Sequence, residues 1–277
     1  MGKIQKNSSS GQVLLITLLV LSVAVTIALS LIGRGTMDAN MSANLEESAR
    51  AFNAAEAGIE EALKTGLSTA TAQVLSPGLT YNVNVSMVGG AASVYQLPKK
   101  TTRGTTETVW LTNHNADGSL NEAPAYAGST IHVCWSSEAT IPAIEMTLLY
   151  KRGSSYLVSK SALDPDATRA GTNKFTNSGI STPGCGISNY YSATVDFPSL
   201  GIIVGDTVLA LRLTPRYSDS RIAIDPGAIA LPQQGNQVES TGSTAGGVSR
   251  KIIVFQQYKA PSSIFDSSIY SQSSFGR

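Results

Sequence analysis

The chain has 277 residues and a formal net charge of +1, and only 14% of its residues are charged. Ordinary soluble domains carry about a quarter charged residues. No block of lysine and arginine occurs that could compete for phosphates, which argues against a nucleic-acid partner. Glycine, serine, threonine and asparagine are plentiful instead, a composition that suits short strands joined by many turns and a surface outside the cell.

The first predicted element is a membrane-spanning helix. Residues 13–32 read VLLITLLVLSVAVTIALSLI, a run without a charge. As a helix this run spans about 30 Å, the thickness of a bilayer core. Lys3 and Lys6 precede it, so the positive-inside tendency puts residues 1–11 in the cytoplasm and residues 33–277 outside.

A cleaved secretory signal peptide is the alternative interpretation of this run. Such peptides have an apolar region of about 7–15 residues before a small-residue cleavage site. Ala28-Leu29-Ser30 would serve as that site, but Leu31 and Ile32 continue the apolar run beyond it. The longer run favours a retained helix.

The helical pattern continues as an amphipathic stretch over residues 36–64, so one helix over residues 12–64 is predicted, about 80 Å long. Gly66 is its expected C-cap. Glu56 falls within the apolar seam, where its carboxylate either reaches water at the edge or contacts the rest of the protein or a neighbouring subunit. The apolar residues that recur on one helical face are Met37, Met41, Leu45, Ala49, Phe52, Ile59 and Leu63.

Small hydroxyl residues form a stripe within the membrane run. Ser22, Thr26 and Ser30 recur at every fourth position, so they share one face of the helix. Residues of this size permit close approach and hydrogen bonds between helices. Alternatively, their hydroxyls bond back to carbonyls of the same helix.

The N-terminal region resembles the type IV pilin family. The residues that carry the resemblance are SGQVLLITLLVLSVAVTIALSL, followed by MSANLEESARAFNAAEAGIEEAL. They look most like PilX-type minor pilins and the large minor pseudopilin at the tip of type II secretion systems. Residues 238–255, VESTGSTAGGVSRKIIVF, are similar to the closing hairpin of the same minor pilins. The resemblance covers residues 1–64 and, more weakly, about 237–258.

The resemblance implies a leader peptide over residues 1–11. In the family a prepilin peptidase cuts after the leader glycine and the new N-terminus is often methylated, which here places the cut between Gly11 and Gln12. The sequence departs from the family motif, because Gln12 replaces the common phenylalanine and Lys6 stands well before Gly11. The alternative is an uncleaved single-pass anchor.

A further departure concerns the fifth mature residue, which is Ile16 rather than glutamate. In the family this glutamate pairs with the terminal amine of a neighbouring subunit. A buried amine without a compensating anion is costly. A subunit that lacks the pairing is better tolerated at a filament tip or in priming than along a shaft.

The remainder predicts an antiparallel β-rich region, so the fold class is α+β. Residues 65–104 are interpreted as a connector and the first strands of a pilin-like head, residues 105–218 as an inserted β-sandwich, residues 219–258 as the closing strands of that head, and residues 259–277 as a Ser-rich tail. The expected strands cover residues 81–87, 107–112, 130–135, 144–150, 156–160, 190–197, 207–213, 221–224, 237–240 and 249–257.

Cys134 and Cys185 are the two cysteines of the chain. An even pair outside the membrane is a disulfide candidate. The bond would close a loop of about 50 residues, worth about 3–4 kcal/mol on the entropic model. Two buried free thiols are the alternative.

The sequence contains no recognisable catalytic or metal motif. His114 and His132 lack ligand neighbours at metal spacing, and no nucleophile elbow, phosphate loop or zincin motif occurs. Asn113 to Gly118 imitates the opening of a calcium loop, but Pro124 stands where the bidentate glutamate should be. A hairpin turn at Asp117-Gly118 is favoured, and neither an enzyme nor a cofactor or metal is expected.

The sequence therefore predicts a minor pilin or pseudopilin, a surface filament subunit that acts by packing and display. Its expected partners are other pilin subunits, prepilin peptidase, the inner-membrane assembly machinery and lipid. The alternative is a single-pass membrane-anchored adhesin or ligand-binding protein that never enters a filament.

Overall fold

The computed structural model describes residues 10–115 and 117–263. Most of the predicted leader, residues 1–9, and most of the predicted tail, residues 264–277, lie outside the described residues. The chain divides into two compact units, each containing segments distant in sequence. Unit 1 comprises Met1–Asn84 and Glu239–Ile253, and unit 2 comprises Val85–Val238 and Val254–Arg277.

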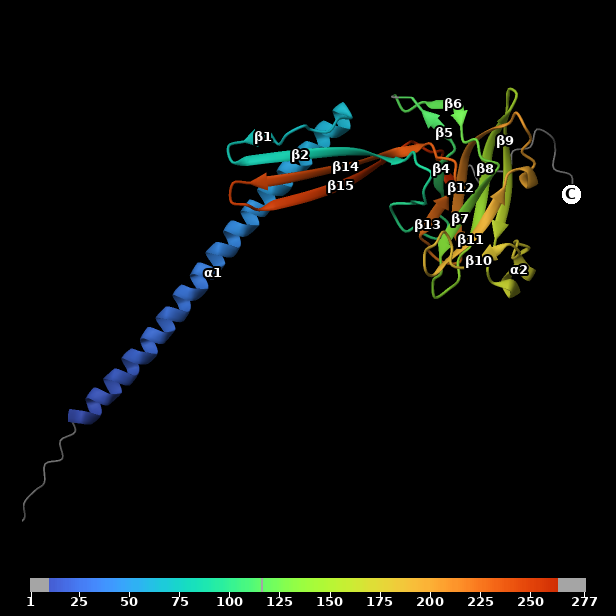
Figure 1. The fold of residues 1–277 in the computed structure, drawn as a ribbon. Helices are drawn as coiled ribbons and strands as arrows, with labels where there is room; N and C mark the ends of the chain where they lie inside the picture. Colours follow the sequence, from blue (N-terminus) through green and yellow to red (C-terminus); the bar gives the residue numbers. More distant parts are fainter. Residues whose placement is uncertain (1–9, 116, 264–277) are drawn as a thin grey trace, which may run out of the picture. The chain divides into compact units, whose positions relative to one another are not determined.

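A single unbroken helix, α1 (Ser10–Thr65), begins the described chain. It continues through Gly33 and Gly35, where neither residue meets another described atom that could force a bend. Gly66 ends the helix as predicted, with a φ of 71° and its amide donating to the Ala62 carbonyl at 2.7 Å. One long helix followed by β-structure confirms the α+β class (Figure 1).

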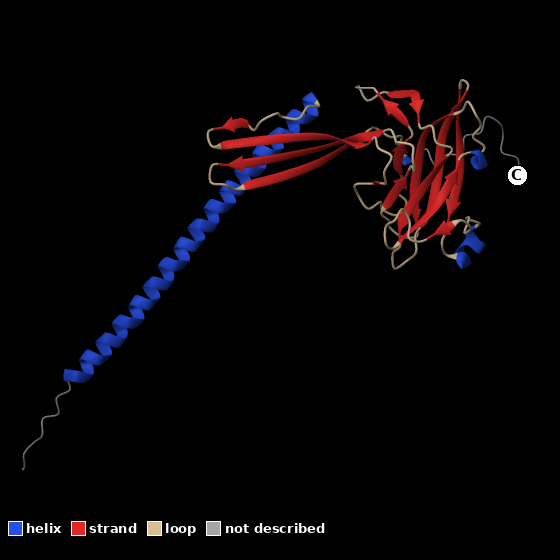
Figure 2. Cartoon of the chain, viewed as in Figure 1, coloured by secondary structure: helices blue, strands red, loops and turns tan. Residues whose placement is uncertain are grey.

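A four-stranded sheet accompanies α1, in the order β1-β2-β14-β15. Its strands are β1 (Gln73–Ser76), β2 (Leu79–Gly89), β14 (Gln233–Thr244) and β15 (Ser249–Gln257). In Figure 2 the parts of β2, β14 and β15 that belong to unit 1 run beside the C-terminal half of the helix. The strands β14 and β15 cover most of residues 238–255, where a closing hairpin was expected.

The helix meets this sheet through small residues, because the backbones approach closely. The buried helix residues are Ala51, Ala54, Ala55, Gly58, Ile59 and Ala62. A Cβ built on Gly242 of β14 would lie 2.6 Å from the Ala55 amide nitrogen and still closer to the Ala51 carbonyl oxygen. The contact therefore requires glycine on the strand as well as small residues on the helix.

Unit 2 contains two larger sheets and a hairpin. The orders are β10-β11-β7-β13-β3, β4-β12-β8-β9 and β5-β6. The bounds are β3 (Tyr95–Gln96), β4 (Glu107–Trp110), β5 (Thr112–His114), β6 (Leu120–Ala125), β7 (Thr130–Ser136), β8 (Ala143–Arg152), β9 (Ser155–Leu163), β10 (Ile180–Ser181), β11 (Tyr190–Asp196), β12 (Thr207–Arg216) and β13 (Ile222–Asp225), with the short helix α2 (Ala167–Asn173) and a 3-10 turn (Pro198–Leu200).

One apolar core joins the two larger sheets of unit 2. It includes Trp135 of β7, Ile224 of β13, Leu148 of β8 and Leu213 of β12, each nearly or fully buried. The indole nitrogen of Trp135 donates to the Pro142 carbonyl at 3.0 Å, so the largest buried ring leaves no polar group unpaired.

The predicted boundaries of the inserted region need correction. The prediction was 105–218, whereas unit 2 begins at Val85, extends to Val238 and takes in the chain from Val254. The reason is strand pairing. The short strand β3 pairs with β13, and β13 pairs with β7, so both belong to the sheet of unit 2 although the sequence suggested that they belong to the head.

The close approach at Gly242 gives the first prediction. Gly242→Ala places a methyl group against backbone atoms of α1, so we expect a loss of about 3 kcal/mol, the upper range for overpacking. Amide hydrogen exchange of residues 51–62, measured on the full chain in detergent, should accelerate. Gly35→Ala is the control, because nothing described lies within 4 Å of its added Cβ. Unchanged exchange in Gly242→Ala would contradict the packing.

Candidate functional site

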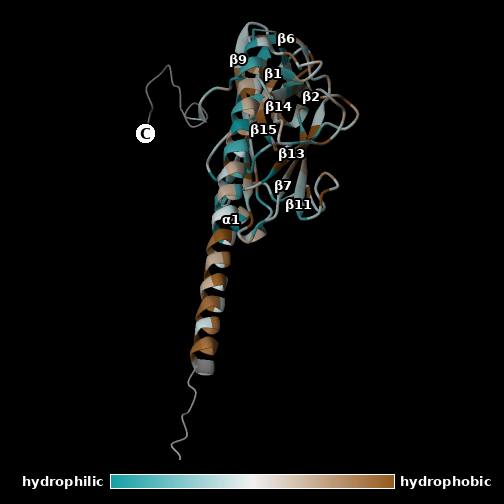
Figure 3. Cartoon of the chain, turned by 90° about the vertical axis from the view of Figure 1, so that its left-hand side faces the viewer, coloured by the Kyte–Doolittle hydropathy of each residue, from teal (hydrophilic) through white to brown (hydrophobic). Residues whose placement is uncertain are grey.

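The N-terminal half of α1 is a bare apolar surface. It is long and apolar enough to cross a membrane, and its apolar window is entirely unburied within the described chain. Figure 3 shows hydrophobic residues all round this half of the helix. Gly11 and Gln12, the predicted processing site, belong to the first turn of α1.

The hydroxyl stripe bonds to its own helix. Ser22 donates to the Leu19 carbonyl at 2.8 Å, and Thr26 donates to the Ser22 carbonyl at 2.8 Å. Ser30 is exposed, as are the other two. Ser22 and Thr26 therefore form the predicted alternative, hydrogen bonds to carbonyls of their own helix. A role of these hydroxyl residues in packing between chains stays a prediction.

The C-terminal half of α1 separates small from large apolar residues. The predicted seam placed Phe52, Ile59 and Leu63 together, but only Ile59 is buried, at 8% exposure. Phe52 and Leu63 remain 45% and 44% exposed. The sheet takes the small face because a bulky side chain there would hold the two backbones apart.

Four large apolar residues left outside share one side of the helix, and we call them the exposed stripe: Met41, Leu45, Phe52 and Leu63. At 3.6 residues per turn they fall on one face, next to the face that meets the sheet. Glu56 lies within this row and is exposed, which agrees with the interpretation that its carboxylate reaches water in a single chain.

The two cysteines are joined. Cys134 of β7 and Cys185 form a disulfide that links residues 51 apart in sequence. Cys134 is fully buried beside Tyr190 and Ala223. The bond fastens the 183–187 loop to the central strand of its sheet.

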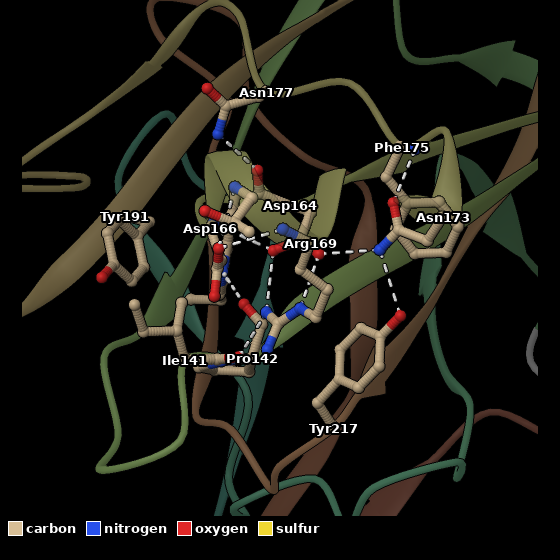
Figure 4. Close-up of polar contacts among 12 residues, drawn as sticks. Ile141, Pro142, Asp164, Asp166, Arg169, Asn173, Phe175, Asn177, Tyr191 and Tyr217 are labelled. Carbon is tan, nitrogen blue, oxygen red and sulfur yellow. Dashed lines mark hydrogen bonds and ion pairs between the residues drawn. The ribbon is translucent and has the colours of Figure 1, made fainter. Parts of the chain in front are cut away.

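A buried ionic cluster, which the sequence did not reveal, holds the segment after β9 (Figure 4). Asp164 is completely buried and accepts from Arg169 at 2.7 and 2.8 Å and from Asn173 at 2.8 Å. Arg169 also donates to the Ile141 carbonyl at 2.7 Å and lies 3.9 Å from the ring centroid of Tyr217. The cluster fixes the position of α2 and of the residues that follow it.

Two opposing effects act on Asp164. Burial by itself raises the pKa of this carboxyl, but the hydrogen bonds from Arg169 and Asn173 and the charge of Arg169 outweigh burial and lower the pKa below its ordinary value. The one local signal in the sequence was Asp166, which caps α2 by accepting from the amides of Thr168 and Arg169. The partner carboxylate could not be recognised from spacing alone.

The segment around Asp117 and Gly118 forms the expected hairpin. Strands β5 and β6 pair across a turn in which Gly118 has a φ of 80°. His114 stacks on Tyr258, and burial lowers the pKa of His114. His132 instead contacts the hydroxyl of Thr194 at 3.1 Å. Within the described residues, no three His, Cys, Asp or Glu side chains gather as metal ligands would.

Comparison of the chain with protein-family models, with curated proteins and with solved structures found no match.

Asp164 provides the second prediction. Asp164→Asn should destabilise unit 2 by about 3 kcal/mol, because the half-enclosed Arg169 loses its charged partner. A lowered folded-state pKa means that the carboxylate stabilises the protein above about pH 4 and loses this effect as the pH falls further. Urea unfolding of the full chain between pH 7 and pH 2 should therefore show a weaker acid effect in the variant.

Asp166→Asn is the matched control, because asparagine also caps helices. This variant should stay within about 0.5 kcal/mol of the parent. Equal stability of Asp164→Asn and the parent at pH 7 would contradict the role of the cluster.

Proposed function

We propose that this protein is a minor pilin-like or pseudopilin-like subunit of a surface filament. The observation that supports the proposal most is the exposed stripe of α1. Large apolar side chains continue along the helix beyond the membrane-length segment and stay between 44% and 66% exposed. A contiguous exposed apolar surface is typical of an interaction site.

The two faces of α1, one buried against the sheet and one exposed, support packing of this helix against other helices. Its small face is already occupied by the sheet, so the exposed stripe remains for another molecule. Similar rods arranged side by side would cover Leu45 and Phe52 outside the bilayer and the apolar segment within it. A single chain with only a membrane anchor needs the apolar segment, but it has no need of the stripe above it.

The proposed topology has residues 1–11 in the cytoplasm, residues 13–32 across the membrane and residues 33–277 outside. Prepilin peptidase would cut between Gly11 and Gln12, and the inner-membrane assembly machinery would then add the mature subunit to a filament. The absence of a glutamate at Ile16 favours a position at the tip or in priming, where one unpaired amine is tolerated.

Unit 2 is proposed to be the displayed, non-enzymatic part, with its two larger sheets stacked as an inserted β-sandwich. The shared apolar core of these sheets supports the stacking, and the disulfide suits an oxidising exterior. The alternative, an anchored adhesin outside any filament, would retain unit 2 and the membrane segment without using the exposed stripe.

Leader processing gives the third prediction. Mass spectrometry of the N-terminal peptide should find a mature chain that begins at Gln12 in both the membrane fraction and the sheared surface fraction. Gly11→Val should block the cut, whereas Ser10→Ala should leave it intact. If the parent protein keeps residues 1–11, the proposed cleavage between Gly11 and Gln12 is wrong.

The exposed stripe gives the fourth prediction. Phe52→Glu should lower the amount of the protein in sheared filaments at least tenfold, because a carboxylate would be buried between apolar helices at a cost of several kcal/mol. Its amount in the membrane should not change, since Phe52 is 45% exposed in the single chain. Asn53→Glu is the control on another exposed face. Equal assembly of the two variants would favour the anchored alternative.

A further inference from the structure

The strand β15 forms an open edge of the unit 1 sheet. It is the last strand in the order β1-β2-β14-β15 (Figure 1). The Thr244 amide donates to the Val248 carbonyl at 3.0 Å. Because backbone groups alternate in direction along a strand, the amides and carbonyls of Ser249, Lys251 and Ile253 point away from β14. No backbone group of another described residue bonds to these outward groups.

The devices that usually protect an open edge are weak here. Natural proteins protect such edges with proline, with bulges or with outward charges, lysine above all. Residues 249–253 contain no proline. Lys251 forms an ion pair with Glu239 of the neighbouring strand at 2.5 Å, so its charge is compensated within the sheet. Ile253 is 46% exposed. An edge of this kind can accept a further strand through its backbone groups.

The open edge lies on the same flank of α1 as the exposed stripe. Arg250 of β15 donates to the Ser48 hydroxyl at 2.7 Å, and Ser48 precedes Phe52 by about one helical turn. The opposite flank of α1 meets β2, whose Tyr81 hydroxyl donates to Glu61. Glu61 follows Phe52 by about two and a half turns, which places it on the other side of the helix. A neighbouring helix that covers the exposed stripe therefore stands beside the β15 edge.

The other edge of the same sheet, β1, runs in the direction that pairing with β15 requires. The Ala245 amide donates to the Gly78 carbonyl at 2.7 Å, so the β1–β2 turn and the β14–β15 turn lie at the same end of the sheet. Strand β1 runs toward that end and β15 runs away from it. Two copies with parallel α1 helices therefore present β15 and β1 to each other as antiparallel strands. On β1, Val74 is 73% exposed and Leu75 is 46% exposed.

We propose that β15 of one copy pairs with β1 of a second copy, so that their unit 1 sheets become one antiparallel sheet. The inference rests on the proposed filament role, because helices anchored in one membrane are parallel and bring these two edges together. An antiparallel pair of two β15 strands would instead invert one helix. Outward amides and carbonyls hold the pair, and Ile253 meets an exposed side chain of β1. A contact between two different edges can be repeated along a helical filament.

Cysteine cross-linking between copies tests the pairing. One tagged chain carries Ile253→Cys, and a second chain with a different tag carries Val74→Cys or Leu75→Cys. Both are expressed in the same cells, and the sheared filaments are mildly oxidised. Opposed residues of paired strands lie within reach of a disulfide, so the mixed dimer should exceed the dimer of two Ile253→Cys chains at least tenfold. Equal or stronger linkage between two Ile253→Cys chains would overturn the proposal.

Proline substitution tests the outward backbone separately from the side chain. Ile253→Pro removes an outward amide and keeps the bonds to β14, so the variant should fold but its amount in sheared filaments should fall at least tenfold. Ile253→Thr keeps the amide and suits a strand, so it should assemble like the parent. Thermal unfolding of each full chain in detergent verifies folding. If Ile253→Pro does not fold, the cross-linking result decides.

Failure of this inference can be told from failure of the filament role. If the parent protein is missing from sheared filaments, both are wrong. If Phe52→Glu is excluded from filaments while Ile253→Pro assembles like the parent and no mixed disulfide forms, the filament role stands and the pairing of sheets is overturned.

Discussion

The close approach of β14 to α1 is the constraint on which the rest of unit 1 depends. Gly242 lies so near the helix that even a methyl group would overlap its backbone. Such proximity is possible only where the helix offers alanine and glycine, and the residues Ala51, Ala54, Ala55 and Gly58 meet that need. Close backbone approach gains dispersion contacts over many atoms, and Ile59 is the one large helix residue that is buried there among the described residues.

That exclusion determines what the helix can offer to other molecules. Phe52, Leu45 and Leu63 are apolar, yet none can enter the interface with the sheet, so they remain exposed. The same helix therefore has one face that packs on the sheet and another that stays exposed. The exposed stripe and the membrane-length segment both lie on α1, which is why the proposed filament role rests on the helix and not on unit 2.

Unit 2 is stabilised separately, by its own apolar core, a disulfide and a buried ion pair. The disulfide secures a loop on the five-stranded sheet, while Asp164 and Arg169 secure the turn after β9. These devices fix loops, which otherwise contribute most of the mobility of a β-rich domain.

The sequence by itself determined the features that depend on local periodicity: the apolar run, the helix that ends at Gly66, the alternating strands and the absence of recognisable catalytic motifs. Only the tertiary structure decided which helical face would be buried, because periodicity identifies apolar residues but does not distinguish those small enough for backbone contact from those that must stay outside. The pairing of β3 with β13 and the contact of Arg169 with the Tyr217 ring likewise join residues far apart in sequence. Their proximity arises from strand order, which no single segment encodes.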